Sequence, residues 1–202
     1  MLQSLQEGDA ESNAIKQFSI WWKDAINSEI EEVNALTLAT ATATGKPSAR
    51  IVLLKGYDEN GFVFFTNYES NKGKELAGNP QGCMVFFWKE LERQIRIDGS
   101  IEKITAAEND DYFFSRPVSS QVGAWASPQS TVIANREVIE ENVKKYEAQF
   151  AAASMSRPPH WGGYRLRPQT IEFWQGRPSR LHDRLLYTLV KDEEWKIERL
   201  AP

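Results

Sequence analysis

Short runs of alternating aliphatic, β-branched and aromatic residues, separated by turn signals, constrain most strongly what this chain can fold into. Alternation at period two is typical of half-buried strands, and the turn "TGKP" between the first two runs predicts a hairpin. The predicted strands are "ALTLATAT" (35–42), "SARIVLLK" (48–55), "FVFFT" (62–66), "CMVFFW" (83–88), "RQIRIDGSIEKI" (93–104), "YRLRP" (164–168), "TIEFW" (170–174), "LLYTLV" (185–190) and "WKIERL" (195–200), the last two joined by the turn "KDEE".

Helical segments are inserted between these strands. Helical spacing covers residues 15–30, 69–78, 105–115 and 135–150. The third segment begins with a capping-box signature, Thr105 and Glu108, and Pro117 ends it.

The number and order of these elements predict the fold class. Roughly seven to nine strands with about four helices favour a mainly β protein with inserted helices (α+β), built as an antiparallel barrel. The sequence has neither regular βαβ alternation nor a glycine-rich dinucleotide fingerprint, which argues against a Rossmann fold. We expect a single domain over 15–202 that follows a flexible N-terminal lead over 1–14.

Overall charge and cysteine usage limit the partners and the compartment. A net charge of −4 at pH 7 argues against nucleic-acid binding but allows a local basic pocket for a small anion. No stretch reaches the ~18 apolar residues of a membrane span, and the N-terminal stretch lacks the apolar core of a signal peptide. The single cysteine, Cys83, lies in an apolar run, so we expect a buried thiol and a cytoplasmic protein.

Cations stand near both ends of the apolar strand that contains "ARIVLLK". Arg50 and Lys55 are five positions apart, so they lie about 16 Å apart and face opposite sides of the pleat. They predict either two separate anion contacts or two solvated strand ends. Ser70 and Lys72 begin a predicted helix, where free backbone amides favour an anion, although a surface helix without a ligand has the same pattern.

A second group of anion-binding residue types lies on either side of a proline. Tyr112 and Arg116 are four residues apart on one predicted helix face, and Ser120 follows the turn. Three donors could thus converge on one phosphate, or Arg116 only offsets the dipole at a helix C-terminus. Gln129 and Ser130 add an amide and a hydroxyl, or form only a turn.

The segment "EFWQGRPSRLHDR" is the most unusual part of the chain. Arg180, His182 and Arg184 alternate along a predicted extended segment and therefore share a face, and Trp174 offers a flat ring. His182 could accept a proton or donate a hydrogen bond near neutral pH, or it is a structural histidine beside Asp183. No metal site or nucleophile triad is predicted from two histidines and one cysteine, so a cofactor must supply the difficult chemistry.

Taken together, the ordered motifs resemble the pyridoxamine 5′-phosphate oxidase family over residues 18–202. The motifs are "RIVLLK", "LERQ", "SRPVSSQVGAW", "WGGYRL", "EFWQG", "RLHDR" and "WKIERLAP". The resemblance implies an FMN-binding split β-barrel and a homodimer with one FMN in each of two clefts between the subunits. It also implies oxidation of pyridoxamine 5′-phosphate and pyridoxine 5′-phosphate by O2 to pyridoxal 5′-phosphate and H2O2, with ammonia from the amine, as the last step of vitamin B6 cofactor synthesis and salvage. The alternative on the same fold is a non-catalytic flavin or pyridoxal phosphate binder.

The resemblance also assigns residues to the ligands. The residues implied to hold FMN are Arg50, Ile51, Val52, Leu53, Leu54, Lys55, Phe65, Thr66, Asn71, Lys72, Gln94, Gln129, Ser130, Trp174 and Arg184. The residues implied to hold the substrate are Lys55, Tyr112, Arg116 and Ser120 at its phosphate and Arg180, Leu181 and His182 at its ring, with Arg180 and His182 as the catalytic pair. Three departures stand out: residues 1–16 lack the arginine and tyrosine with which relatives often cover the substrate, Asn71 replaces a basic residue, and Asn34 stands where some relatives have an aspartate.

Overall fold

A single antiparallel sheet organises the computed structural model, which describes residues 4–191 and 194–202. Its strands are β1 (Ala35–Ala41), β2 (Pro47–Leu53), β3 (Gly56–Asp58), β4 (Gly61–Asn67), β5 (Gln81–Trp88), β6 (Arg93–Lys103), β7 (Trp161–Gln175), β8 (Asp183–Lys191) and β9 (Glu194–Arg199). The strand order is β2-β1-β5-β6-β7-β4-β3, and β8 pairs with β7 and β9. Directly after β2, the Lys55 amide donates to the Val63 carbonyl of β4 at 2.8 Å, which draws the two edges of the curved sheet together.

Five α-helices accompany the sheet in the described parts of the chain. They are α1 (Ala14–Asn27), α2 (Asn71–Gly78), α3 (Ala106–Ser115), α4 (Val118–Ala126) and α5 (Glu137–Ala151). The predicted capping box is confirmed, because the Thr105 hydroxyl accepts from the Glu108 amide while the Glu108 carboxylate accepts from the Thr105 amide. A mainly β fold with inserted helices is therefore confirmed as well.

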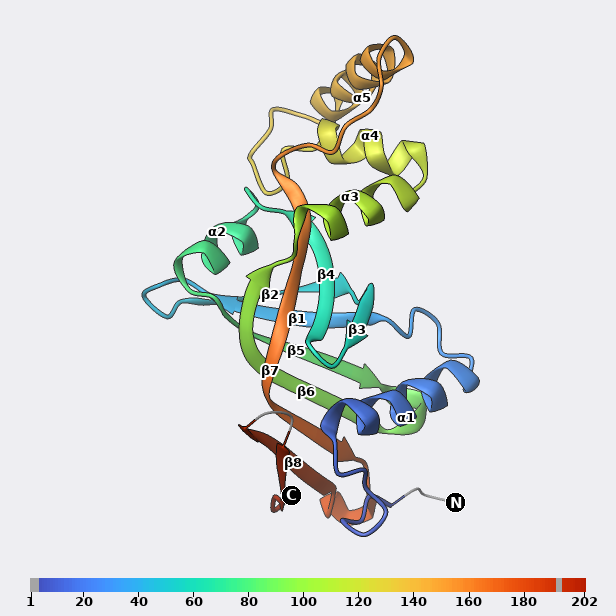
Figure 1. Cartoon of the computed structure of the whole chain (residues 1–202), viewed down its shortest axis with the longest axis vertical. Coiled ribbons are helices and arrows are strands. Elements are labelled where there is room, and N and C mark those ends of the chain that lie inside the picture. The colour runs from blue at the N-terminus through green and yellow to red at the C-terminus, as the bar shows by residue number, and fades with distance from the viewer. Residues whose placement is uncertain (1–3, 192–193) are drawn as a thin grey trace.

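The longest strand, β7, connects the two ends of the molecule (Figure 1). It pairs with β6 along its length, with β4 over its first half and with β8 over its second half. The register shifts between Asp98 and Gly99, opposite Pro168. A proline cannot donate to the ladder, and a β-bulge accommodates it. The sequence therefore wrongly predicted two separate strands, "YRLRP" and "TIEFW", where the structure has one bulged strand.

The hydrophobic core contains one face of α1 and the buried side chains of the sheet. Phe18 of α1 is fully buried, and its ring centroid lies 4.8 Å from that of Tyr57 and 4.9 Å from that of Phe62. A third ring, Phe86 of β5, lies 5.5 Å away. Ile20, on the outer face of α1, is 43% exposed, so one helix face supplies most of the packing.

Other boundaries differ from the sequence prediction for local reasons. The first helix begins directly after its N-cap residue, Asn13, and ends at Asn27, three residues before the predicted end. Pro117 does end α3, but it also stands immediately before α4, an element that the sequence analysis missed. Proline suits the start of a helix as well as the position after its end, because the first turn needs no amide donor from it. The short strand β3 lies where only a turn was predicted.

The N-terminal residues contact the C-terminal hairpin. Leu5 is 5% exposed, and the Tyr187 hydroxyl donates to the Glu11 carbonyl at 2.9 Å. Residues 1–3 of the predicted flexible lead and residues 192–193 of the predicted turn "KDEE" lie outside the described residues. None of the helices in the described ranges has the length and apolarity needed to cross a bilayer.

Replacing Phe18 by alanine should lower the free energy of unfolding by about 3–5 kcal/mol, because it leaves a cavity among three aromatic rings. Urea denaturation at a fixed protein concentration measures the change. Ile20→Ala, on the exposed face of the same helix, is the matched control and should cost about 1 kcal/mol or less. Equal losses for the two variants would contradict this description of the core.

Candidate functional site

A cavity of about 620 Å³ opens between β2, β4 and the α3–α4 region. Its volume lies within the range of small-molecule sites. Eleven predicted site residues line it: Ile51, Val52, Leu53, Lys55, Phe65, Thr66, Lys72, Tyr112, Arg116, Ser120 and Gln129. Residues that the sequence analysis did not assign also line it, namely Asn67, Pro117, Gly123, Ala124, Ser127 and Trp161.

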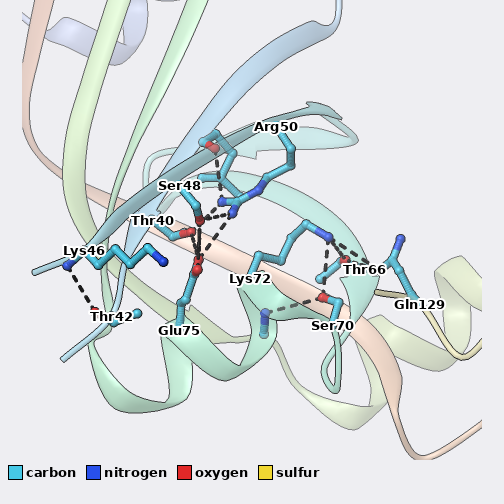
Figure 2. A network of polar contacts seen from close by, with 12 residues as sticks. Thr40, Thr42, Lys46, Ser48, Arg50, Thr66, Ser70, Lys72, Glu75 and Gln129 are labelled. Carbon is cyan, nitrogen blue, oxygen red and sulfur yellow. Dashed lines mark hydrogen bonds and ion pairs between the residues drawn. The ribbon is translucent and has the colours of Figure 1, made fainter. Parts of the chain in front are cut away.

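A buried ammonium group occupies one part of this cavity. Lys72 is 8% exposed, and its Nζ donates to Thr66 Oγ1 at 3.0 Å and to Ser70 Oγ at 3.4 Å (Figure 2). A further contact of 3.4 Å reaches Gln129 Oε1. All three of these partners are neutral oxygens. Burial lowers the pKa of Lys72, and the nearby charge of Arg50 lowers this pKa further, while the charge of Glu75 opposes both. A bound anion would relieve both effects.

A half-buried guanidinium group lies in another part of the cavity. Within residues 4–191 and 194–202, Arg116 Nη1 is buried and has no hydrogen-bond partner. Burial lowers the pKa of Arg116, and its Cζ lies 4.6 Å from the Trp161 ring centroid. The predicted neighbours Tyr112, Ser120 and Lys55 line the same cavity. A buried guanidinium nitrogen without a hydrogen-bond partner is costly, so this arrangement favours an anionic ligand.

Tyr112 and Arg116, which the sequence analysis grouped on one helix face, line the same cavity at the end of α3. Arg116 follows the last residue of α3 and has extended backbone angles (φ −77°, ψ 153°). The helix ends there, and the chain turns at Pro117 into α4, which brings Ser120 to the same cavity.

Stacked aromatic rings line the wall beside the guanidinium group. The Phe65 and Tyr112 centroids are 3.9 Å apart, with planes 25° from parallel. Trp161 continues the stack, 5.3 Å from Phe65. A flat aromatic ligand is suited to such a wall. The motif "WGGYRL" contains Trp161, but it gave no spacing argument that would bring this residue to the cavity.

Arg50 does not line the cavity and is held by another network. Its Nη1 donates to the Leu38 carbonyl at 3.2 Å and to the Thr40 hydroxyl, and its Nη2 contacts Ser48 and pairs with Glu75 Oε2 at 3.2 Å (Figure 2). Glu75 thus compensates the charge of Arg50, a partnership that the sequence analysis missed.

Three more residues predicted to hold FMN are absent from the cavity wall. Leu54 is 4% exposed within the hydrophobic core. Asn71 and Ser130 are exposed and do not line the cavity.

A second group of predicted residues lies on the other half of β7. Gln94, Trp174 and Arg184 are direct cross-strand neighbours on β6, β7 and β8, so the sheet places them in a row. Arg184 Nε donates to Glu172 Oε1 at 2.8 Å, which raises the pKa of Arg184. The Glu172 side chain is 3% exposed and also pairs with Arg96 at 3.1 Å. Sequence reasoning missed Glu172, although it lies within "EFWQG".

The predicted extended segment around Arg180 is wrong. Ser179 (φ 60°) and Arg180 (φ 62°) have left-handed backbone angles inside a short 3₁₀ turn over Pro178–Arg180. The spacing of two therefore does not place Arg180 and His182 on one strand face. Leu181 is 67% exposed.

His182 is oriented by two contacts. Its Nδ1 accepts from the Arg177 amide at 3.1 Å, and its ring centroid lies 4.5 Å from that of Trp174. A ring nitrogen that accepts from an amide carries no proton, so the neutral imidazole keeps its proton on Nε2. His182 can then donate to a ligand through Nε2.

The two groups lie at opposite ends of β7. Trp161 begins the strand beside the cavity, and Trp174 follows it after roughly 40 Å of extended chain. In Figure 1, α3 and α4 lie at one end of this strand and β8 at the other. One copy of the chain therefore does not bring its cavity and its residues 177–184 into one pocket.

Cys83 lies outside the cavity, on β5. Partial burial, together with the hydrogen bond and the charge of Asp98, raises the pKa of its thiol to about 12. A thiol with such a pKa is a poor nucleophile near neutral pH. Among the described residues no group of at least three His, Cys, Asp or Glu side chains is placed to hold a metal ion.

Comparison of structures identifies the fold class. An FMN-binding protein of Nostoc punctiforme, described as related to pyridoxamine 5′-phosphate oxidase, has a TM-score of 0.71 at 18% identity and covers 99% of this chain and 100% of its own. The fold is accordingly the FMN-binding split β-barrel, and the predicted fold class is confirmed.

Sequence comparison identifies the family. A family model described as pyridoxamine 5′-phosphate oxidase matches residues 22–150, and one described as the pyridoxine 5′-phosphate oxidase C-terminal dimerisation region matches residues 161–202. The chain belongs to the pyridoxamine 5′-phosphate oxidase family.

Several relatives match over nearly the full length. Proteins named pyridoxine/pyridoxamine 5′-phosphate oxidase are 54% identical in Trichormus variabilis (100% of this chain, 94% of the relative) and 58% identical in Burkholderia thailandensis (98% and 94%). The structure of PhzG from Burkholderia lata, in complex with tetrahydrophenazine-1-carboxylic acid, has a TM-score of 0.92 at 32% identity and covers 100% of this chain and 99% of its own.

The orientation of His182 predicts its tautomer. In the His160→Gln variant, which leaves a single imidazole, ¹⁵N NMR should find the neutral ring protonated on Nε2 and bare on Nδ1, because Nδ1 accepts from Arg177. A ring protonated on Nδ1 would contradict the contact.

Proposed function

We propose that this protein oxidises pyridoxamine 5′-phosphate and pyridoxine 5′-phosphate with FMN and O2. The amine reaction consumes one O2 and one water and yields pyridoxal 5′-phosphate, ammonia and H2O2. The alcohol reaction consumes one O2 and yields pyridoxal 5′-phosphate and H2O2. Relatives named pyridoxine/pyridoxamine 5′-phosphate oxidase, which are 54–58% identical to this chain, support the proposal.

The observation that carries the proposal is a pair of cations in one cavity, the buried Lys72 and the half-buried Arg116. The buried Arg116 Nη1 has no hydrogen-bond partner in the described part of the chain, and Lys72 Nζ donates to neutral oxygens. Two cations without a hydrogen-bonded carboxylate favour two anions, and FMN and the substrate each bring one phosphate. The aromatic wall beside Arg116 is suited to a flat ring.

The residues present fit FMN. Lys72, Thr66 and Gln129 would hold its phosphate near the N-terminus of α2, where helix amides add favourable charge. The cavity-lining residues of β2, Ile51 to Leu53, would lie along the cofactor. When bound, FMN would supply the redox chemistry that moves two electrons from the substrate to O2.

A second copy of the chain would complete the cavity. The row Gln94–Trp174–Arg184 and the residues Arg180 to His182 lie at the far end of β7, so they would reach the cavity of a partner subunit. The matched dimerisation region, 161–202, contains most of this group. Ile51, on the cavity wall, is 65% exposed in the single chain, which is consistent with a surface that a partner subunit would cover.

The protein's own residues then bind and orient. Arg116, Tyr112, Ser120 and Lys55 would hold the substrate phosphate and so fix the distance of the reacting carbon from the cofactor. His182 would donate from Nε2 to an oxygen substituent on the substrate ring. The Trp174 ring would pack against the His182 imidazole.

An oxygen-electrode assay tests the activity. The purified protein should be yellow and should consume O2 with pyridoxamine 5′-phosphate or pyridoxine 5′-phosphate, releasing H2O2 in equal amount. Yellow protein without turnover would favour the non-catalytic binder. Turnover only with unphosphorylated tricyclic substrates, of the kind found in the PhzG complex, would overturn the proposal.

Arg116→Ala should raise the KM for pyridoxamine 5′-phosphate by between about 10-fold and about 150-fold, the range for a lost hydrogen bond to a charged group. FMN content should stay near that of the wild type, because Lys72 holds a separate part of the cavity. Steady-state kinetics and the flavin absorbance measure both. Arg136→Ala, which removes an arginine that is 89% exposed, is the matched control. Loss of FMN together with substrate affinity would contradict two separate phosphate sites.

A further inference from the structure

The loop that carries Arg180 and His182 has a backbone that its own sequence does not favour. Ser179 and Arg180 are consecutive non-glycine residues with left-handed angles, φ 60° and 62°. A residue with a Cβ rarely adopts this conformation, and it persists only where surrounding contacts hold it. The contacts that hold residues 177–184, called the tail below, therefore matter for any ligand that Arg180 and His182 bind.

Asp183 joins three separated parts of the chain. Its carboxylate accepts from the Leu5 amide at 3.2 Å, from Arg199 Nη1 at 3.0 Å and pairs with Arg177 Nε at 3.5 Å. Its side chain is only 14% exposed. Arg177 and Asp183 bracket Arg180 and His182, so this carboxylate closes the tail into a loop.

Arg199 extends the same cluster to the N-terminal segment. Its Nε and Nη2 donate to the two Glu7 carboxylate oxygens, each at 2.6 Å, and Nη2 also donates to the Leu5 carbonyl at 3.0 Å. The hydrogen bond from Arg199 lowers the pKa of Glu7 to about 2. A bidentate arginine–carboxylate pair fixes geometry as well as charge.

We propose that Asp183 is a positioning residue for the substrate, and that Arg199, Glu7 and the backbone of Leu5 hold it in place. The inference rests on the proposed function, since it takes Arg180 and His182 as contacts to the substrate ring. Asp183 itself touches no substrate. It fixes the tail before the substrate arrives, so Arg180 and His182 do not have to become ordered when the substrate binds. Leu5 and Glu7 thereby stabilise the conformation of the tail.

The first test is the isosteric variant Asp183→Asn, with Glu7→Gln as a milder companion at an exposed pair. Both should raise the KM for pyridoxamine 5′-phosphate, Asp183→Asn by about 10-fold or more and Glu7→Gln by less, with kcat changed less than KM. Lys196→Gln removes an exposed ion pair on the same strand as Arg199 and is the matched control. An unchanged KM in folded Asp183→Asn, or an equal effect in Lys196→Gln, would overturn the proposal.

Hydrogen exchange gives a readout that needs no activity. The amides of Arg177 and Leu181, which donate to His182 Nδ1 and to the Pro178 carbonyl, should exchange faster in Asp183→Asn and Glu7→Gln than in the wild type or Lys196→Gln. Wild-type rates at these amides in both variants would overturn the proposal. If Asp183→Asn does not fold, Glu7→Gln alone decides.

A charge exchange separates Asp183 from the Glu7–Arg199 pair. The double variant Glu7→Arg with Arg199→Glu restores an ion pair between these two positions but puts a carboxylate against Asp183. This double variant should therefore keep a raised KM and fast amide hydrogen exchange in the tail. Full recovery would show that the pair alone matters and would overturn the role of Asp183.

The outcomes for the tail and for the activity can be told apart. A wild type that fails to oxidise either phosphorylated substrate refutes the proposed function, whatever the exchange rates are. A wild type that turns over, with Arg180→Ala impaired and Asp183→Asn normal, refutes only the positioning role.

Discussion

The pairing of β7 is the constraint on which the rest of the structure depends. β6 pairs with it over nearly its whole length, whereas β4 and β8 share its other edge, one at each end. The strand can do so only because Gly99 and Pro168 meet at the bulge: a Cβ on Gly99 would lie 2.0 Å from the Arg167 carbonyl oxygen. This geometry fixes the cavity at one end of β7 and the tail at the other. The site that we propose would therefore need two copies of the chain.

Charge compensation separates the arginines of the molecule into two kinds. Arg50 and Arg184 are each paired with a carboxylate, Glu75 and Glu172, whose side chains are 14% and 3% exposed. These pairs are built into the sheet and keep their geometry without a ligand. Arg116 differs, because its buried Nη1 faces the cavity side of the fold without such a partner in the described residues. The position of carboxylates thus decides which cation is available to a phosphate.

Local sequence patterns predicted those features that depend on a few neighbouring residues. The Thr105–Glu108 capping box and the end of α2 at Gly78 depend on contacts within one turn, and the structure has both. These local patterns failed where contacts between residues far apart in the sequence outweigh the local conformational preference. The sheet joins two predicted strands across Pro168, and the surroundings of the tail hold Ser179 and Arg180 at angles that no spacing rule anticipates.

The sequence by itself determined the residue types of the site: two sets of cations with hydroxyl and amide partners, a flat aromatic residue before the tail, and one histidine beside Asp183. Only the tertiary structure decided which of them meet. Strand register placed Gln94, Trp174 and Arg184 in one row. The packing of the end of α3 beside β7 brought Arg116 to Trp161, while burial placed Leu54 in the core and Arg50 paired with Glu75. The physical reason is that spacing along a chain fixes directions only within one regular element. Contacts between elements depend on hydrogen-bond register and on which charges find a partner, and both are properties of the folded chain.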